Sequence, residues 1–246
     1  MVSSSARQFV EPRNIKITQK RFIEILKYII FCYHQLCADN KSGKTIYSRQ
    51  YVKDYTSSHF EVFLKMNFVD DYLQQLKISY PEKKLIKDVH FQYETEKRFL
   101  SNGKEKRDKI GIIINKIGLQ EYWKTEVNEN IYFAIECKVL TDTLNNSEYV
   151  RDIHKFTERK YIQLRLPFEG MIGFIIESSI LLRNIVEDIN NRLKAHKEIN
   201  TISYLMNVEI YHDFNLSFES EHFKQFNTSK FKIYHLFFDY IKIVTK

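Results

Sequence analysis

Residues 131–140, IYFAIECKVL, decide how this chain folds. Apart from Glu136 and Lys138 the stretch is entirely apolar, rich in β-branched and aromatic residues, and short, which predicts a buried β-strand. Side chains alternate between the two faces of a strand, so Glu136 and Lys138 are expected to point the same way. The other face is expected to be apolar and to carry Phe133, Ile135, Cys137 and Val139.

A carboxylate and an ammonium on the same face of a hydrophobic strand call for an explanation, because burying either charge alone costs much free energy. Residues 108–114, DKIGIII, predict the preceding strand, and Asp108 begins it. If the two strands pair antiparallel, Asp108 comes close to Glu136. Two adjacent carboxylates repel each other, and a divalent cation removes that repulsion. Hard oxygen donors suit Mg²⁺, with Mn²⁺ able to substitute, and the main-chain carbonyl of Cys137 is a further candidate ligand.

This arrangement predicts hydrolysis of a phosphodiester. A bound Mg²⁺ polarises a phosphoryl group and lowers the pKa of a bound water. Lys138 is expected to position that water or to help deprotonate it, and to stabilise the charge that develops on phosphorus. The predicted catalytic residues are therefore Asp108, Glu136 and Lys138. The alternative is that Glu136 forms a salt bridge with a basic neighbour.

Elements around these two strands predict an α/β core behind a helical N-terminal region. The N-terminal region, residues 1–81, has apolar residues at helical spacing after Thr18 and again over residues 48–78, and Pro81 ends it. Residues 82–246 form the predicted core. Its further elements are helices over residues 147–164 and 178–195 and strands over residues 170–177, 202–211 and 231–243.

Residues 82–100 predict a helix whose apolar stripe would include position 96. That position holds Glu96, and an acid on an inward face is costly unless it is paired or bound to a metal. Glu96 is thus a candidate further metal ligand. The alternative is a partly exposed glutamate at the helix edge.

The composition favours a polyanionic partner. The 246 residues carry a formal net charge of +7, and Lys and Arg release counterions when they neutralise phosphates. Three cysteines without close pairing favour a reducing compartment. The chain shows neither the apolar stretch of a secretory signal nor a run long enough to span a bilayer, so we expect a cytoplasmic protein that does not enter a membrane.

Two groups of polar residues are candidates for contact with nucleic-acid phosphates. The first lies beside Asp108 and the second on or after the helix that follows Lys138. The alternatives are a solvated basic loop and an ordinary helix C-terminus. The first group contains Lys104, Lys106, Arg107 and Lys109, and the second contains Arg159, Lys160, Gln163 and Arg165.

Two late histidines, His222 and His235, are predicted to be packed or hydrogen-bonded rather than catalytic. Neither has a second histidine at metal-ligand spacing. Serine nucleophile elbows, phosphate-binding P-loops and dinucleotide fingerprints are absent from the sequence.

The pattern of Asp108 on one strand and Glu136-Cys137-Lys138 on the next resembles the PD-(D/E)XK nuclease superfamily. The resemblance spans roughly residues 82–243 and extends to the helix after Lys138, the GMIGF strand of residues 170–174 and the HLFFDY strand of residues 235–240. It departs from the pattern before Asp108, where Lys106-Arg107 replaces the proline.

The resemblance implies a restriction-endonuclease-like mixed central sheet flanked by helices. It also implies a DNA endonuclease that serves restriction or anti-phage defence, with DNA as substrate. The expected partners are a second copy of the chain and an ATPase, a helicase or a methyltransferase. Residues 1–81 would recognise DNA or dock the partner. Two alternatives stay open: a non-catalytic nucleic-acid-binding or assembly module with a nuclease-like fold, and RNA as the substrate.

Overall fold

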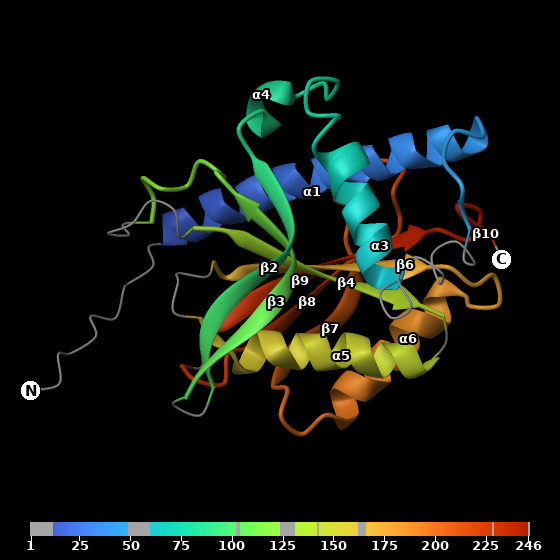
Figure 1. The fold of residues 1–246 in the computed structure, drawn as a ribbon. Coiled ribbons are helices and arrows are strands. Elements are labelled where there is room, and N and C mark those ends of the chain that lie inside the picture. The colour runs from blue at the N-terminus through green and yellow to red at the C-terminus, as the bar shows by residue number, and fades with distance from the viewer. Residues whose placement is uncertain are drawn as a thin grey trace, which may run out of the picture.

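A mixed sheet of eight strands forms the centre of the structure, a computed structural model that describes residues 12–48, 60–101, 104–123, 131–141, 143–161, 166–227 and 229–245 (Figure 1). Strands β4, β6 and β9 run parallel, and the other neighbours run antiparallel. The predicted α/β class with a mixed central sheet is therefore confirmed. In spatial order the strands are β5 (Lys160–Tyr161), β2 (His90–Ser101), β3 (Lys104–Asn115), β4 (Phe133–Leu140), β6 (Phe168–Ile175), β9 (Lys230–Asp239), β8 (Ser217–Phe223) and β7 (Thr201–Asn207).

Helices cover both faces of this sheet. Helix α1 (Pro12–Lys41) crosses one face, whereas α5 (Thr143–Glu158) and α6 (Leu182–Ala195) cover the other (Figure 1). The alternation of β4 follows from this layering, because Ile135 and Cys137 belong to the core under α1 and Leu140 belongs to the core under α5.

Helix α1 shares one hydrophobic core with the sheet. Its ring of Phe22 lies 4.4 Å from that of Phe133 on β4, and Tyr33 stacks at 4.2 Å on Phe238 of β9. The two-stranded parallel sheet of β1 (Tyr47–Ser48) and β10 (Val244–Thr245) joins the N-terminal part to the C-terminal end. The division expected between residues 81 and 82 therefore does not separate two cores.

The predicted helix over residues 48–78 is confirmed in part. Helix α3 (Phe60–Asn67) continues into the π-helical η1 (Phe68–Leu73), while residues 49–59 lie outside the described part. The short helix α4 (Lys83–Ile86) follows.

The helix predicted over residues 82–100 is wrong beyond α4, because strand β2 begins at His90. Leu85, Val89 and Tyr93 satisfy helical spacing, yet Phe91, Tyr93 and Phe99 also satisfy the spacing of a strand. Pairing with β3 along nearly its whole length decides between the two patterns. Strand β3 begins at Lys104, four residues before the start predicted at Asp108.

Strand β8 has no counterpart in the sequence interpretation. Its buried positions are held by Ser217, Ser220 and His222 rather than by aliphatic residues, so the sequence lacks the apolar alternation of a strand.

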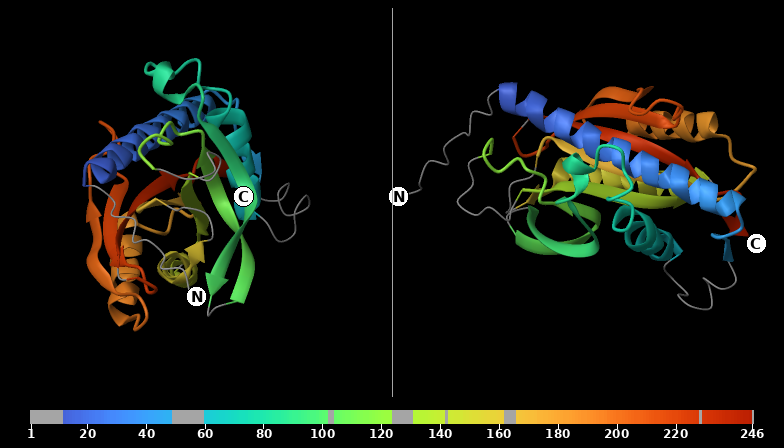
Figure 2. Two further views of the ribbon diagram at one scale, coloured as in Figure 1. Left: turned by 90° about the vertical axis from the view of Figure 1, so that its left-hand side faces the viewer. Right: turned by 90° about the horizontal axis from the view of Figure 1, so that it is seen from above.

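The β2–β3 hairpin bends away from the rest of the sheet. Pairing of β3 with β4 ends at Ile112 and Ile135, although pairing of β3 with β2 continues to the hairpin tip. At the bend Glu94 adopts a positive φ of 52°. We call residues 95–101 and 104–110, beyond this bend, the ribbon. Figure 2 shows α5 end-on between the hairpin and the end of the sheet formed by β7 and β8.

Candidate functional site

Glu136 lies where β3 and β4 separate. The main-chain N–H of Gly111 donates to Glu136 Oε2 at 3.1 Å, so this carboxylate takes the place of a main-chain acceptor at the split. Glu136 is 9% exposed. A Cβ on residue 111 would come within 2.8 Å of the carbonyl oxygen of Ile135, which explains why a glycine stands there.

Lys138 lies between two carboxylates from two helices. Its Nζ is 3.2 Å from Oε2 of Glu61 on α3 and 3.2 Å from Oδ2 of Asp152 on α5. Burial lowers the pKa of Lys138, but Asp152 and Glu61 raise it more, so the pKa lies above its ordinary value. Lys138 therefore stays cationic at neutral pH. As a cation it is suited to orient a water or stabilise an anion, and unsuited to accept a proton.

Further ion pairs extend this arrangement in both directions. Asp152, which is 2% exposed, also binds Lys155 at 2.6 Å. On the other side Lys65 of α3 is buried, pairs with Glu94 and is stabilised as a cation by Glu61; Glu94 in turn lies 3.8 Å from Lys109. We call the whole set the charged row: Lys109, Glu94, Lys65, Glu61, Lys138, Asp152 and Lys155.

The charged row joins five elements, β2, β3, α3, β4 and α5. It begins on the hairpin, passes through α3 and β4 and ends on α5. Its charges alternate, so each internal charge lies between two of opposite sign. The row positions Lys138 from both sides, because a side chain held by two carboxylates loses much of its rotational freedom.

Cys137 points to the face of β4 opposite Lys138. It is fully buried in the core under α1, and burial raises the pKa of its thiol. This confirms the prediction that the face opposite Glu136 and Lys138 is apolar. Its backbone pairs with Ile172 of β6.

Asp108 lies on β3, as the sequence predicts, and its backbone pairs with Lys97 of β2. It stands three residues before Gly111, the residue that binds the Glu136 carboxylate. The side chain of Asp108 lies outside the described part, so its approach to Glu136 stays a prediction. Among the side chains that are described, no three acidic, histidine or cysteine groups converge as a metal site.

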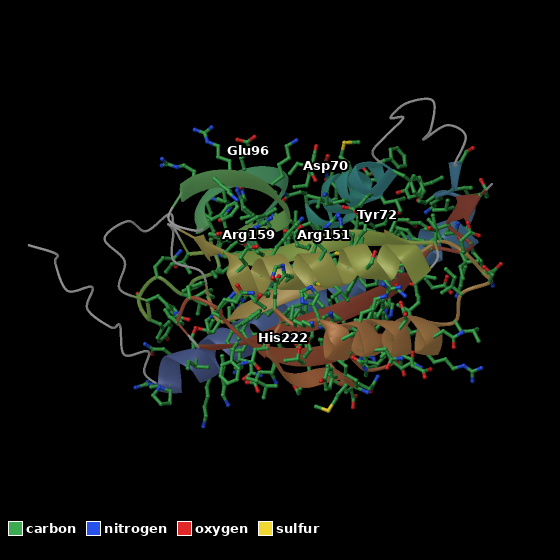
Figure 3. The ribbon with its side chains drawn as sticks, turned by 90° about the horizontal axis from the view of Figure 1, so that it is seen from below. Asp70, Tyr72, Glu96, Arg151, Arg159 and His222 are labelled. Atoms are coloured by element: carbon green, nitrogen blue, oxygen red, sulfur yellow. The ribbon has the colours of Figure 1, made fainter. Side chains whose placement is uncertain are left out.

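Glu96 does not join the site. It lies on a strand rather than a helix, its side chain is 57% exposed, and it faces Arg107 at 3.8 Å. Figure 3 shows it on the outer side of the hairpin, away from α5. Of the two alternatives for Glu96, the structure matches the exposed glutamate, although on a strand rather than at a helix edge, because strand alternation turns this position to solvent.

The candidate phosphate-binding residues fall into different environments. Lys106, Arg107 and Lys109 are exposed on the ribbon. Arg159 is only 7% exposed and lies over the ring of Phe99 at 4.7 Å, so it packs between the hairpin and α5 instead of facing solvent (Figure 3). The remaining predictions concern side chains outside the described part: Lys104, Lys160, Gln163 and Arg165.

The two histidines form a buried hydrogen-bonded chain, which confirms the packed interpretation. Tyr149 contacts His235 Nδ1 at 2.9 Å, and Ser220 bridges the Nε2 atoms of His235 and His222 at 2.8 Å each. His222 Nδ1 then contacts Thr201 at 3.1 Å. A neutral imidazole offers one donor and one acceptor, so the chain is satisfied in a single direction without any charge.

Sequence reasoning missed Glu61 and Asp152. Asp152 lies on α5 between the buried residues Tyr149, Ile153 and Phe156, so an acid on the apolar side of that predicted helix was an available signal. Glu61 had no such signal, since the fold of α3 against β4 was not predictable from spacing.

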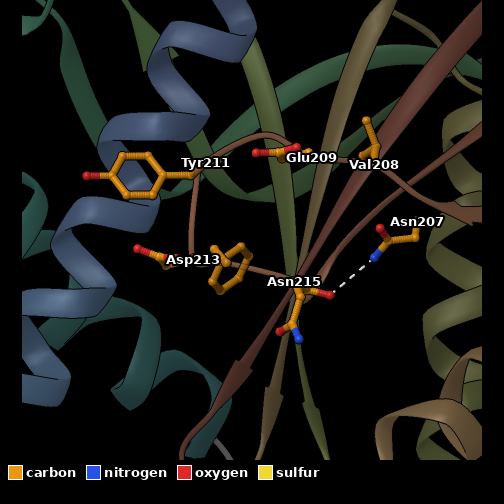
Figure 4. A pocket seen from close by; sticks show the side chains of 7 residues that line it. Asn207, Val208, Glu209, Tyr211, Asp213 and Asn215 are labelled. Carbon is orange, nitrogen blue, oxygen red and sulfur yellow. Dashed lines mark hydrogen bonds between the residues drawn. The ribbon is translucent and has the colours of Figure 1, made fainter.

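A shallow pocket of about 340 Å³ lies elsewhere, on the connection between β7 and β8 (Figure 4). Asn207, Glu209, Tyr211, Asp213 and Asn215 are among its lining residues. It contains none of the residues predicted from the sequence to act in a site.

Comparison of the chain with protein-family models, with curated proteins and with solved structures finds no match. In the described part of the chain, every helix is too short or too polar to cross a bilayer.

Proposed function

We propose that this protein is a metal-dependent endonuclease that hydrolyses phosphodiester bonds of DNA, with Asp108, Glu136 and Lys138 as its catalytic residues. The observation that carries the proposal is the position of Glu136 and Lys138. Both extend from one face of β4 at the point where β3 and β4 separate, and Lys138 is fixed as a cation. A reacting phosphate needs acidic and cationic groups together at such an opening.

Carboxylate oxygens are the donors that Mg²⁺ takes, so Asp108, Glu136 and the Cys137 carbonyl would hold the ion, with Mn²⁺ as a substitute. The ion would supply a polarised phosphate and an acidified water. Lys138 would stabilise the negative charge that builds on the phosphate. Glu61 and Asp152 would hold the Lys138 ammonium in place from two sides.

The order of elements supports a restriction-endonuclease-like fold. The acid-bearing strand β3, its antiparallel neighbour β4, helix α5 and the parallel strand β6 follow in the sequence implied by the PD-(D/E)XK resemblance. By the same analogy the protein would act in the cytoplasm in restriction or anti-phage defence. It would work as a homodimer or with an ATPase, a helicase or a methyltransferase.

One observation favours a second candidate, a non-catalytic nucleic-acid-binding or assembly module with a nuclease-like fold. Glu61 and Asp152 already balance the charge of Lys138, as they would in a purely structural ion-pair network. The two candidates differ in whether DNA is cut.

Cleavage of a supercoiled plasmid separates them. In Mg²⁺ the parent is expected to convert the plasmid to nicked and linear forms, and chelation by EDTA is expected to stop it. Asp108→Ala, Glu136→Ala and Lys138→Ala are each expected to slow cleavage at least about 100-fold, the scale of losing a group that stabilises the transition state.

Glu148→Gln is the matched control, because Glu148 is an exposed acid on α5 whose ion pair, among the residues that the structure describes, is with Arg151 of the same helix. It is expected to cut like the parent. If the parent leaves plasmid and single-stranded RNA intact in Mg²⁺ and in Mn²⁺, the nuclease proposal is rejected and the binding module is favoured. Cleavage that survives all three alanine variants would reject this site.

A further inference from the structure

The outer face of the ribbon presents three cations and one acid to solvent. Residues directly opposite on paired strands share a face, and Glu96 pairs with Lys109 as Arg98 pairs with Arg107. All four side chains are exposed, whereas the neighbouring Phe99 is buried. We call these four residues the outer face of the ribbon.

The arginine pair is the unusual feature of this face. Like charges directly opposite each other destabilise a hairpin, because their β-carbons are only about 5 Å apart. Glu96 lies 3.8 Å from Arg107, longer than a strong charge-assisted hydrogen bond. Two adjacent guanidinium groups are suited to hold one phosphate between them.

The base of the ribbon meets the candidate site. Lys109 is the first member of the charged row, which leads through α3 to Lys138. Along β3, Arg107 is four residues from Gly111, about 13 Å at roughly 3.3 Å per residue.

We propose that the outer face of the ribbon, centred on Arg98 and Arg107, binds the phosphate backbone of duplex DNA beside the bond that lies at Glu136 and Lys138. The choice of DNA rests on the proposed function. The binding itself rests on the opposed arginines, their exposure and their connection to the charged row.

Binding of a fluorescein-labelled duplex in EDTA, measured by anisotropy over a series of salt concentrations, tests this without cleavage. The double variant Arg98→Ala with Arg107→Ala is expected to weaken binding at least about 10-fold. The slope of log affinity against log salt should fall by about 2, since each lost phosphate contact contributes about 0.9. Arg98→Lys with Arg107→Lys should keep most of the slope, because charge rather than shape dominates it.

A second double variant, Arg183→Ala with Lys197→Ala, is the matched control. It removes two exposed cations from α6 and the turn after it, outside the ribbon. It is expected to bind with the slope of the parent. The inference is overturned if the parent does not bind the duplex, or if the ribbon variant loses no more than this control.

Failure of this inference and failure of the proposed function give different results. A ribbon variant that binds like the parent while the parent cuts plasmid overturns only the ribbon. A ribbon variant that loses binding while the parent never cuts overturns only the nuclease. Because all four substituted side chains are exposed, thermal melting should show the same fold in every variant.

Discussion

At the scale of single residues, the proposed catalytic role of Lys138 depends on how its ammonium group is held. A buried ammonium is tolerated only when carboxylates compensate its desolvation, and here Glu61 and Asp152 do so from opposite helices. The same pairs keep Lys138 cationic. A catalytic lysine and a structural lysine would therefore make the same contacts in the absence of DNA. They differ in whether the ammonium group contacts a bound phosphate.

Asp152→Asn is expected to destabilise the protein strongly. The substitution removes the carboxylate that Lys138 and Lys155 share. That carboxylate lies in the interior, since Asp152 is 2% exposed. Breaking one partner of a buried ion pair costs about 3 kcal/mol. Urea unfolding would measure it, with Glu148→Gln on the same helix expected to change the unfolding free energy by less than about 0.5 kcal/mol. Equal effects of the two variants would show that Asp152 does not support the charged row.

The sequence predicted part of this site for a physical reason. Strand alternation is local, so the shared face of Glu136 and Lys138 and the opposite orientation of Cys137 could be read from residues 131–140 alone. Glu61 and Asp152 reach Lys138 through tertiary packing of α3 and α5. No spacing rule connects residues that far apart in the chain.

At the scale of elements, the β2–β3 hairpin shows where local pattern is insufficient. Residues 82–100 fit helical and strand periods nearly equally, and hydrogen bonding to β3 selects the strand. That selection moves Glu96 from a predicted core position to solvent and places Arg98 opposite Arg107. The predicted strands β4, β6 and β9 carried long apolar runs and were found close to their expected bounds.

The chain of His222, Ser220 and His235 predicts loss of stability in acid. Burial, together with Lys224, lowers the pKa of His222 to about 3, and burial together with His222 lowers that of His235 well below its ordinary value. Both rings stay neutral in the fold but take up protons when unfolded, below about pH 6.5. Stability is therefore complete above that pH and falls as pH decreases, by about 2 kcal/mol per histidine at pH 5.

Urea unfolding at pH 7 and pH 5 measures this loss. The two rings cause a difference in the free energy of unfolding between pH 7 and pH 5, and His222→Gln should remove about half of it. Should that variant not fold, carbon-13 shifts of the histidine rings in the native protein give the same answer. Rings that become charged between pH 7 and pH 5 without unfolding would contradict the argument.

At the scale of the whole molecule, α1 and the sheet act as one unit. Phe22 and Tyr33 of α1 lie against β4 and β9, and the β1–β10 pair ties residue 47 to residue 244. The sequence suggested a separate helical region because its helices precede every strand of the core. Amphipathic spacing shows that a helix has an apolar face but not which surface covers it.

A chain of residues 82–246 alone is therefore expected not to fold. Without α1 the buried rings of Phe133 and Phe238 would face water. We expect this fragment to lack a cooperative thermal transition and to bind the dye ANS, whereas the full chain unfolds in one transition. A fragment with a sharp transition of its own would show that residues 1–81 form an attachment rather than part of the core.

The most direct test of the central claim is the rate at which the purified protein nicks supercoiled plasmid in Mg²⁺, compared between the parent and Glu136→Gln. This substitution keeps the size of the side chain and an acceptor for Gly111, so it changes charge with little change of shape. We predict nicking by the parent and at least about 100-fold slower nicking by the variant. Equal rates, or no nicking by a folded parent, would contradict it.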